Sequence, residues 1–182
     1  MNADVPALVR YFETYLGPIQ SGLRLSEGVQ GVTFREQPVT GATAFTTLGL
    51  CNHLLAQKRG PSVRVEFLLA CQNSFIDSFR PLSVLADVSD QALALHSAPP
   101  RGRFFAESQM EALYYAAPVY FQDGLVNFSG FVEPLLLIWL VPISPAEAAF
   151  VKTHGWSRFE TLLTELDPDL LDLLRAPVVD HE

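Results

Sequence analysis

The clearest hydrophobic pattern in the chain lies at residues 135–141, which read LLLIWLV and contain no charged or hydroxyl-bearing residue. This run is too short to cross a bilayer, which needs roughly 20 apolar residues. It is typical of a strand that is covered on both faces. Pro142 is expected to end the strand, because proline cannot donate a hydrogen bond to a neighbouring strand.

Start and stop signals predict three short helices after this strand. Residues 144–147 (SPAE) have the form of a capping box with proline at the first helical position, and Gly155 fits the left-handed residue that closes a helix. Residues 157–160 predict the start of a second helix, and Asp167 with Pro168 that of a third. Leucines alternate with acids over residues 161–174, which predicts an amphipathic helix whose acidic face meets solvent or a basic partner.

Helical and strand-like periods also alternate earlier in the chain. A helix is expected over residues 5–16 with Asp4 as its cap, and helical spacing returns from Phe75 until before Pro99, with Pro81 in a first turn or at a break. Strands are expected near residues 31–36, 42–50, 63–70 and 103–105, with a polar loop before the first. Residues 112–121, which Pro118 interrupts, are expected to form an edge strand or an extended loop. The order predicts one α+β domain over residues 1–182, with a mixed or antiparallel sheet, helices packed on it and a helical C-terminus.

Composition supports a folded chain inside the cell. At 182 residues and 49% hydrophobic content, the chain can bury a substantial core. Its first residues lack the apolar segment of a signal peptide. Cys51 and Cys71 lie in apolar segments, which favours buried, reduced thiols and a cytoplasmic location.

The net charge of −8 is concentrated near the C-terminus. Residues 144–182 carry eight acids and three bases, a balance of −5, and the remaining residues carry twelve acids and nine bases, a balance of −3. This balance argues against nucleic-acid binding, which needs a basic surface. It suits a basic protein partner, although an acidic surface can also serve solubility alone.

Catalytic, metal and nucleotide motifs are weak in this sequence. Cys51 and His53 would share one face of a strand, so a metal or nucleophile is conceivable there, but no second cluster has ligand spacing. Glu66 lies in an apolar strand, where it is either a perturbed acid or a carboxylate that faces solvent or pairs with Arg64 or Arg35. No glycine-rich phosphate loop occurs. We therefore expect no enzyme, metal or cofactor; the competing hypothesis is an enzyme with a pocket around these side chains.

An aromatic and acidic segment is the best candidate contact surface. It contains Tyr114, Tyr115, Tyr120, Phe121 and Asp123. Aromatic side chains on an irregular edge strand often anchor partner proteins, and such an edge can accept an added strand. The alternative is that about half of these rings fill the core while the tyrosine hydroxyls reach water.

Several segments together resemble the suppressor-of-fused-like domain family. They are residues 46–50 (TTLGL), 64–68 (RVEFL), 118–121 (PVYF) and 134–175, which run from the apolar strand to Arg175. The resemblance implies a protein-binding module, and for a stand-alone domain of the bacterial type it implies an immunity protein that neutralises a polymorphic toxin. A housekeeping interaction domain remains the alternative. On either reading the expected partner is a protein, such as a basic toxin domain, and neither nucleic acid nor a membrane.

Overall fold

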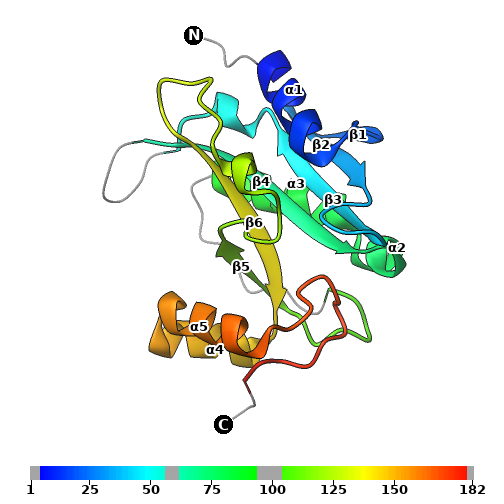
Figure 1. Cartoon of the computed structure of the whole chain (residues 1–182), viewed down its shortest axis with the longest axis vertical. Helices are drawn as coiled ribbons and strands as arrows, with labels where there is room; N and C mark the ends of the chain where they lie inside the picture. Colours follow the sequence, from blue (N-terminus) through cyan, green and yellow to red (C-terminus); the bar gives the residue numbers. More distant parts are fainter. Residues whose placement is uncertain (1–4, 56–61, 94–103, 180–182) are drawn as a thin grey trace.

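The computed structural model describes residues 5–55, 62–93 and 104–179. Six strands form one mixed sheet in the order β1-β2-β3-β4-β6-β5 (Figure 1). They are β1 (Ser21–Ser26), β2 (Val29–Arg35), β3 (Ala42–Leu48), β4 (Arg64–Gln72), β5 (Ala112–Ala116) and β6 (Leu135–Ile143). The helices are α1 (Val5–Leu16), α2 (Ile76–Phe79), α3 (Pro81–Leu93), α4 (Pro145–His154) and α5 (Trp156–Leu166), with short 3-10 turns η1 (Leu50–Asn52), η2 (Asn73–Phe75) and η3 (Asp123–Val126).

The sheet has two antiparallel parts that meet at a central parallel pair. Strands β1 to β4 pair antiparallel in sequence order, β6 runs parallel to β4, and β5 closes the sheet as an antiparallel edge. Both central strands are strongly apolar, as expected where helices and loops cover a sheet on both faces. The predicted α+β class with a mixed sheet is confirmed.

Each face of the sheet carries its own hydrophobic core. On one face, Leu8 and Phe12 of α1 and Phe159 of α5 pack against the sheet. On the other face, Leu85 and Val88 of α3 do so. Helix α1 lies at one end of the molecule, and α4 and α5 lie at the other (Figure 1). The edge strand β5 lies close to these two C-terminal helices (Figure 1).

The strand predictions need three corrections. Residues 21–26, predicted as loop, form β1, an edge strand that is largely exposed and so lacks a buried alternation. Phe104 and Phe105, part of a predicted strand, lie in a bend. Pro142 lies within β6 and does not end it. Strand β4 pairs with β6 only as far as Trp139, so proline lies where β5 is the single neighbouring strand.

The C-terminal helices also differ from prediction. The capping box of α4 is present, with both Ser144 and Glu147 bonded as expected, and Gly155 closes the helix at φ 85°. The same glycine, and not Ser157, is the N-cap of α5. The predicted third helix is wrong: the described residues beyond Leu166, 167–179, form turns, bends and irregular chain.

Side-chain hydrogen bonds explain why that third helix does not form. The Asp169 carboxylate accepts from the amide of Leu171 at 2.9 Å, and Asp172 accepts from the amide of Leu174 at 2.8 Å. Such local bonds offer the backbone an alternative to helix. In the central region, Pro81 begins α3 after a left-handed Arg80, as the sequence allowed. Asp4 and Pro99 lie outside the described residues.

Candidate functional site

The structure distributes the five candidate partner-binding residues over several environments. Tyr114 and Phe121 are buried, whereas Tyr115 and Tyr120 are 43% and 36% exposed. Asp123 is exposed at the start of η3. Two of the four rings therefore fill the core, and the other two are partly exposed at the surface.

Adjacent positions on β5 send the two tyrosines of that strand in opposite directions. Tyr114 packs edge-on against Phe159 of α5 with ring centroids 5.2 Å apart. Tyr115 lies against Phe67 of β4 at 6.1 Å, on the other face of the sheet. Consecutive strand residues alternate between faces, so these two side chains do not share one surface.

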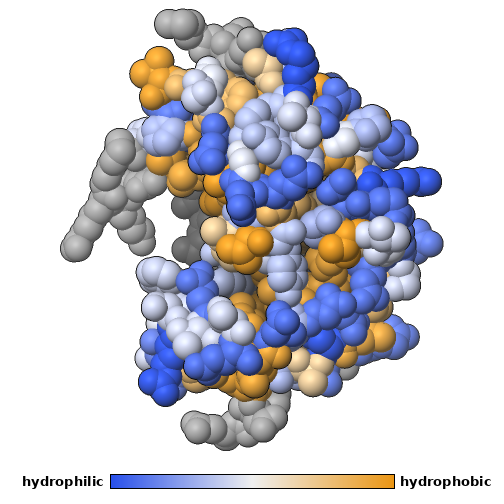
Figure 2. Space-filling model, viewed as in Figure 1, coloured by the Kyte–Doolittle hydropathy of each residue, from blue (hydrophilic) through white to orange (hydrophobic). Residues whose placement is uncertain are grey.

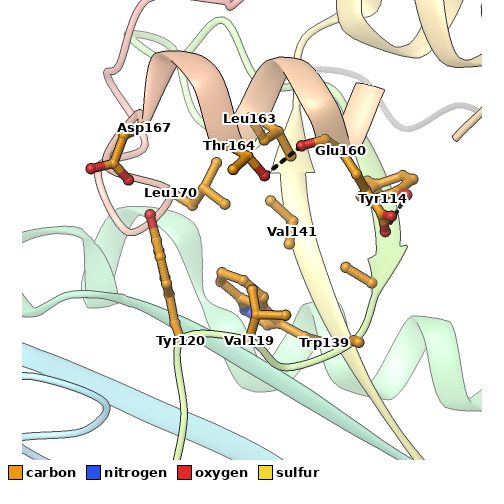
Figure 3. A pocket seen from close by; sticks show the side chains of 12 residues that line it. Tyr114, Val119, Tyr120, Trp139, Val141, Glu160, Leu163, Thr164, Asp167 and Leu170 are labelled. Atoms are coloured by element: carbon orange, nitrogen blue, oxygen red, sulfur yellow. Dashed lines mark hydrogen bonds between the residues drawn. The ribbon is translucent and has the colours of Figure 1, made fainter. Parts of the chain in front are cut away.

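Tyr114 and Tyr120 instead line one pocket between the sheet and α5 (Figure 3). Its volume is about 410 Å³, within the range of small-ligand sites. The described residues that line it come from β5, β6, the segment after β5, and α5 with the turn that follows. They are Tyr114, Ala116, Ala117, Val119, Tyr120, Trp139, Val141, Glu160, Leu163, Thr164, Asp167 and Leu170. We call this the α5 pocket.

Aromatic rings form one side of the α5 pocket. Tyr120 lies over Trp139 with ring centroids 5.1 Å apart, and Trp139 is only 1% exposed. The indole Nε1 of Trp139 is buried and donates to no acceptor among the described residues. A buried donor without an acceptor is uncommon in folded proteins and calls for a specific explanation.

Acidic side chains form the opposite side. The Tyr114 hydroxyl donates to Glu160 Oε1 at 3.1 Å, and the Tyr120 hydroxyl, which points toward the end of α5, donates to the carbonyl of Pro168 at 3.0 Å (Figure 3). Burial, and then the Glu160 carboxylate, raises the pKa of Tyr114 to about 12. Burial, and then Asp167, raises the pKa of Tyr120. At both phenols a nearby carboxylate therefore adds to the larger effect of burial.

A buried ion pair fixes the segment that carries Asp167 and Leu170. Arg175 donates to both carboxylate oxygens of Glu147, at 2.7 and 3.1 Å, and both side chains are almost fully buried. Glu147 also accepts from the amides of Ser144 and Val178. The capping residue of α4 therefore also ties down the C-terminal segment beside the α5 pocket.

Glu66 lies in a separate, closed site. Its carboxylate is fully buried and accepts from the amides of Gly49 and Cys51, at 2.8 and 3.1 Å, and from the Thr47 hydroxyl. Burial raises the pKa of Glu66, and these hydrogen bonds oppose the shift. Neither suggested arginine pairs with it: the Arg64 head binds Glu133 at 2.9 Å and the Cys51 carbonyl at 2.7 Å. Glu66 thus holds the backbone turn at η1.

The structure separates Cys51 from His53. Cys51 is buried in η1, whereas His53 is exposed beyond its end, because these residues form a 3-10 turn and not the strand that would align them. Burial, with the neighbouring Glu66, raises the pKa of Cys51 far above its ordinary value. Such a thiol is unreactive as a nucleophile.

The described part of the chain has neither a cluster of metal-binding side chains nor a membrane-spanning helix. Within it, no group of three or more His, Cys, Asp or Glu side chains is arranged to hold a metal ion. Nor does it contain a helix long and apolar enough to cross a bilayer.

Of the lining residues that the sequence does not single out as candidates, Trp139, Glu160 and Asp167 matter most for the chemistry of the α5 pocket. The sequence pattern places Glu160 and Asp167 at helix starts and Trp139 within an apolar strand. A signal was present, because Trp139 is the one residue in positions 135–141 whose side chain can donate a hydrogen bond.

Comparison with protein families identifies the fold. The model of the suppressor of fused protein (SUFU) family matches residues 26–176. The chain belongs to this family. Immunity protein YqcF of Bacillus subtilis (strain 168) is 24% identical to the SUFU chain over 153 residues, which cover 79% of this chain and 78% of YqcF.

Two solved structures share the SUFU fold of this chain. A SUFU homologue from Neisseria gonorrhoeae FA 1090 superposes with a TM-score of 0.63 at 18% identity, covering 98% of this chain and 96% of the homologue. A chain of the Sufu–Fu complex superposes with a TM-score of 0.66 at 10% identity. The match covers 99% of this chain and 91% of the chain in the complex. At these identities the likeness concerns the fold alone.

Proposed function

We propose that this SUFU chain, acting as one domain over residues 1–182, is a non-catalytic protein-binding domain that serves as an immunity protein. The observation that carries the proposal is the match to an immunity protein across nearly four fifths of both chains. The Sufu–Fu complex, in which a protein of the same fold is found with a protein partner, supports the coarser role of protein binding.

Direct occlusion of a toxin is the mechanism that fits the structure best. The α5 pocket offers aromatic anchors beside carboxylates, on a rigid sheet and helix, so little ordering would be needed on binding. On the face seen in Figure 2, apolar side chains form separate patches among hydrophilic ones. A partner would therefore contact several small apolar patches rather than one continuous apolar surface. If the partner is basic, the net charge of −8 speeds its association with this protein.

Catalysis by the competing pocket has little support from the geometry. The two Glu66 oxygens are occupied by three donors, Cys51 is buried, and His53 lies in solvent. A substrate would have to displace the hydrogen bonds that hold η1 before it reached either group. We therefore expect the Cys51→Ala variant, provided that it folds, to bind its partner as the parent does.

Affinity purification of the tagged protein from its own cells, with mass spectrometry of what is retained, tests the proposal. We expect a toxin encoded by a neighbouring gene, and protection of cells that co-express that toxin. Tyr120→Ala should weaken the complex by about 2 kcal/mol, roughly thirtyfold, because it removes a half-exposed aromatic anchor. Cys51→Ala is the control and should bind like the parent.

Two results would contradict immunity by direct binding. Retained proteins that are unrelated to any toxin would indicate a housekeeping interaction domain. Protection that survives loss of the complex, or that is lost in a folded Cys51→Ala variant, would indicate a catalytic role.

A further inference from the structure

We propose that the α5 pocket binds a single arginine or lysine side chain of the partner protein. The inference rests on the proposed function in that it assumes a protein partner, and it adds the chemistry and the place of the main anchor. It is carried by three features of the pocket: its carboxylates, its exposed aromatic ring and its unpaired indole N–H.

The charge of the lining selects a cation. Glu160 and Asp167 are the charged residues among the described lining, and none of that lining is basic. Glu160 lies within α5 and Asp167 is the C-cap of the same helix, seven residues later, so the two are about 10 Å apart along the helix axis. In Figure 3 Glu160 lies beside Tyr114 and Asp167 lies near the Tyr120 hydroxyl, at the two ends of the cavity, with Thr164 between them. A basic side chain entering there lies between two carboxylates.

The aromatic side of the pocket suits the same ligand. Tyr120 is 36% exposed and faces the cavity from the segment after β5. The ring face of tyrosine attracts ammonium and guanidinium groups within about 6 Å. The same carboxylates add to the larger effect of burial in raising the pKa values of Tyr114 and Tyr120, while Arg175 opposes the rise at Tyr120.

The indole of Trp139 indicates that the ligand also brings an acceptor. Its Nε1 is buried and unpaired among the described residues, and the Trp139 side chain lines the cavity. A peptide that inserts a basic side chain carries backbone carbonyls next to it. One of these carbonyls would give the N–H its missing partner.

Other occupants fit the pocket less well. An apolar side chain would bury Glu160 against hydrocarbon without a counter-charge, which is costly. An acidic segment would be repelled by both carboxylates. A second copy of this chain carries a net charge of −8 itself, so like-charge repulsion opposes self-association through this acidic site.

Nitrogen-15 NMR of the full chain tests the proposal directly, because the protein has two tryptophans and therefore two indole N–H signals. The variant Trp156→Phe identifies the Trp139 signal. The probes are three capped peptides, acetyl-Ala-X-Ala-amide, with X as arginine, its neutral isostere citrulline, or glutamate. We expect the arginine peptide to shift the Trp139 signal saturably, and the other two peptides and the Trp156 signal to show no such response.

Charge-removing variants provide the second arm. Glu160→Gln keeps an acceptor for Tyr114, and Asp167→Asn keeps the size of its side chain, so both should fold. Each should weaken arginine-peptide binding about three- to fivefold, the range of a partly exposed ion pair. Asp90→Asn removes the same charge from α3, on the other face of the sheet, and should have no effect.

Two outcomes would overturn the inference: equal shifts with the arginine and citrulline peptides, or no Trp139 shift up to about 10 mM peptide. If either occurs while the protein still retains its toxin partner and still protects cells, this inference fails and the proposed immunity function stands. If the arginine peptide binds as expected but no protein partner is retained, the proposed function fails and the pocket stands.

Discussion

At Glu66, three hydrogen-bond donors converge on a carboxylate that solvent does not reach. The sequence indicates that a charged residue in this apolar strand needs hydrogen-bond or ionic partners. It suggests arginines for that role, because a sequence shows which side chains are available and not which backbone amides will lie nearby. The actual partners are mostly backbone amides of η1, which face Glu66 only once β3 and β4 are paired. The role of such a residue is visible in three dimensions alone.

The raised pKa of Glu66 makes a prediction for stability. A carboxyl group whose pKa is raised on folding binds its proton more tightly in the folded state, so its contribution is complete below its ordinary value of 4.5 and declines as pH rises. We expect the free energy of unfolding of the parent, minus that of Glu66→Gln, to fall above pH 4.5 by up to about 1.4 kcal/mol per pH unit.

Urea unfolding of both proteins from pH 4 to 8 measures this difference. Taking the difference removes groups common to both, including Glu133, whose pKa is lowered by its hydrogen bond to Arg64. A difference that rises with pH would mean that the hydrogen bonds to Glu66 outweigh its burial.

Among the elements, those with strong local signals were predicted and those set by their neighbours were not. The capping box of α4, the closing Gly155 and the central strands follow from patterns within a few residues. The edge strand β1 and the continuation of β6 through Pro142 depend on which strand lies alongside. The α5 pocket belongs to the second kind, because its lining residues come from segments on both sides of β6 and meet only after folding.

Gly155 supports a prediction at this scale, because one residue both ends α4 and begins α5. Its φ of 85° and ψ of 160° are in a region that is essentially restricted to glycine. A Cβ placed there meets no atom within 4 Å, so the cost of Gly155→Ala is backbone strain alone, about 1–3 kcal/mol.

Thermal unfolding, followed by circular dichroism, checks this value. Ser157→Ala is the matched control: Ser157 is exposed and is not the cap, so its substitution should change stability by less than about 0.5 kcal/mol. The reverse order of effects would restore Ser157 as the start of α5.

For the molecule as a whole, the Glu147–Arg175 pair joins the end of the sheet, α4 and the C-terminal segment. We expect Arg175→Met to destabilise the fold by about 3–5 kcal/mol, since it leaves a buried carboxylate without its counter-charge. The segment that carries Asp167 and Leu170 should also become loose, which would reduce arginine-peptide binding at the α5 pocket.

Chemical denaturation and the same peptide titration measure the two effects. Arg158→Ala, which removes an exposed arginine from α5, should change stability by less than about 0.5 kcal/mol. Equal destabilisation by the two substitutions would show that the ion pair is no more important than a surface charge.

The parallel pairing of β4 with β6 also has a consequence for how the protein is made. Residues 73–134 separate these two central strands, so their contact closes a long loop, and contacts of this kind slow folding. During synthesis, β1 to β4 can pair as each emerges, but the middle of the sheet must wait until residue 143 has left the ribosome. Until then one edge of β4 is unpaired and open to the wrong partner, another chain included.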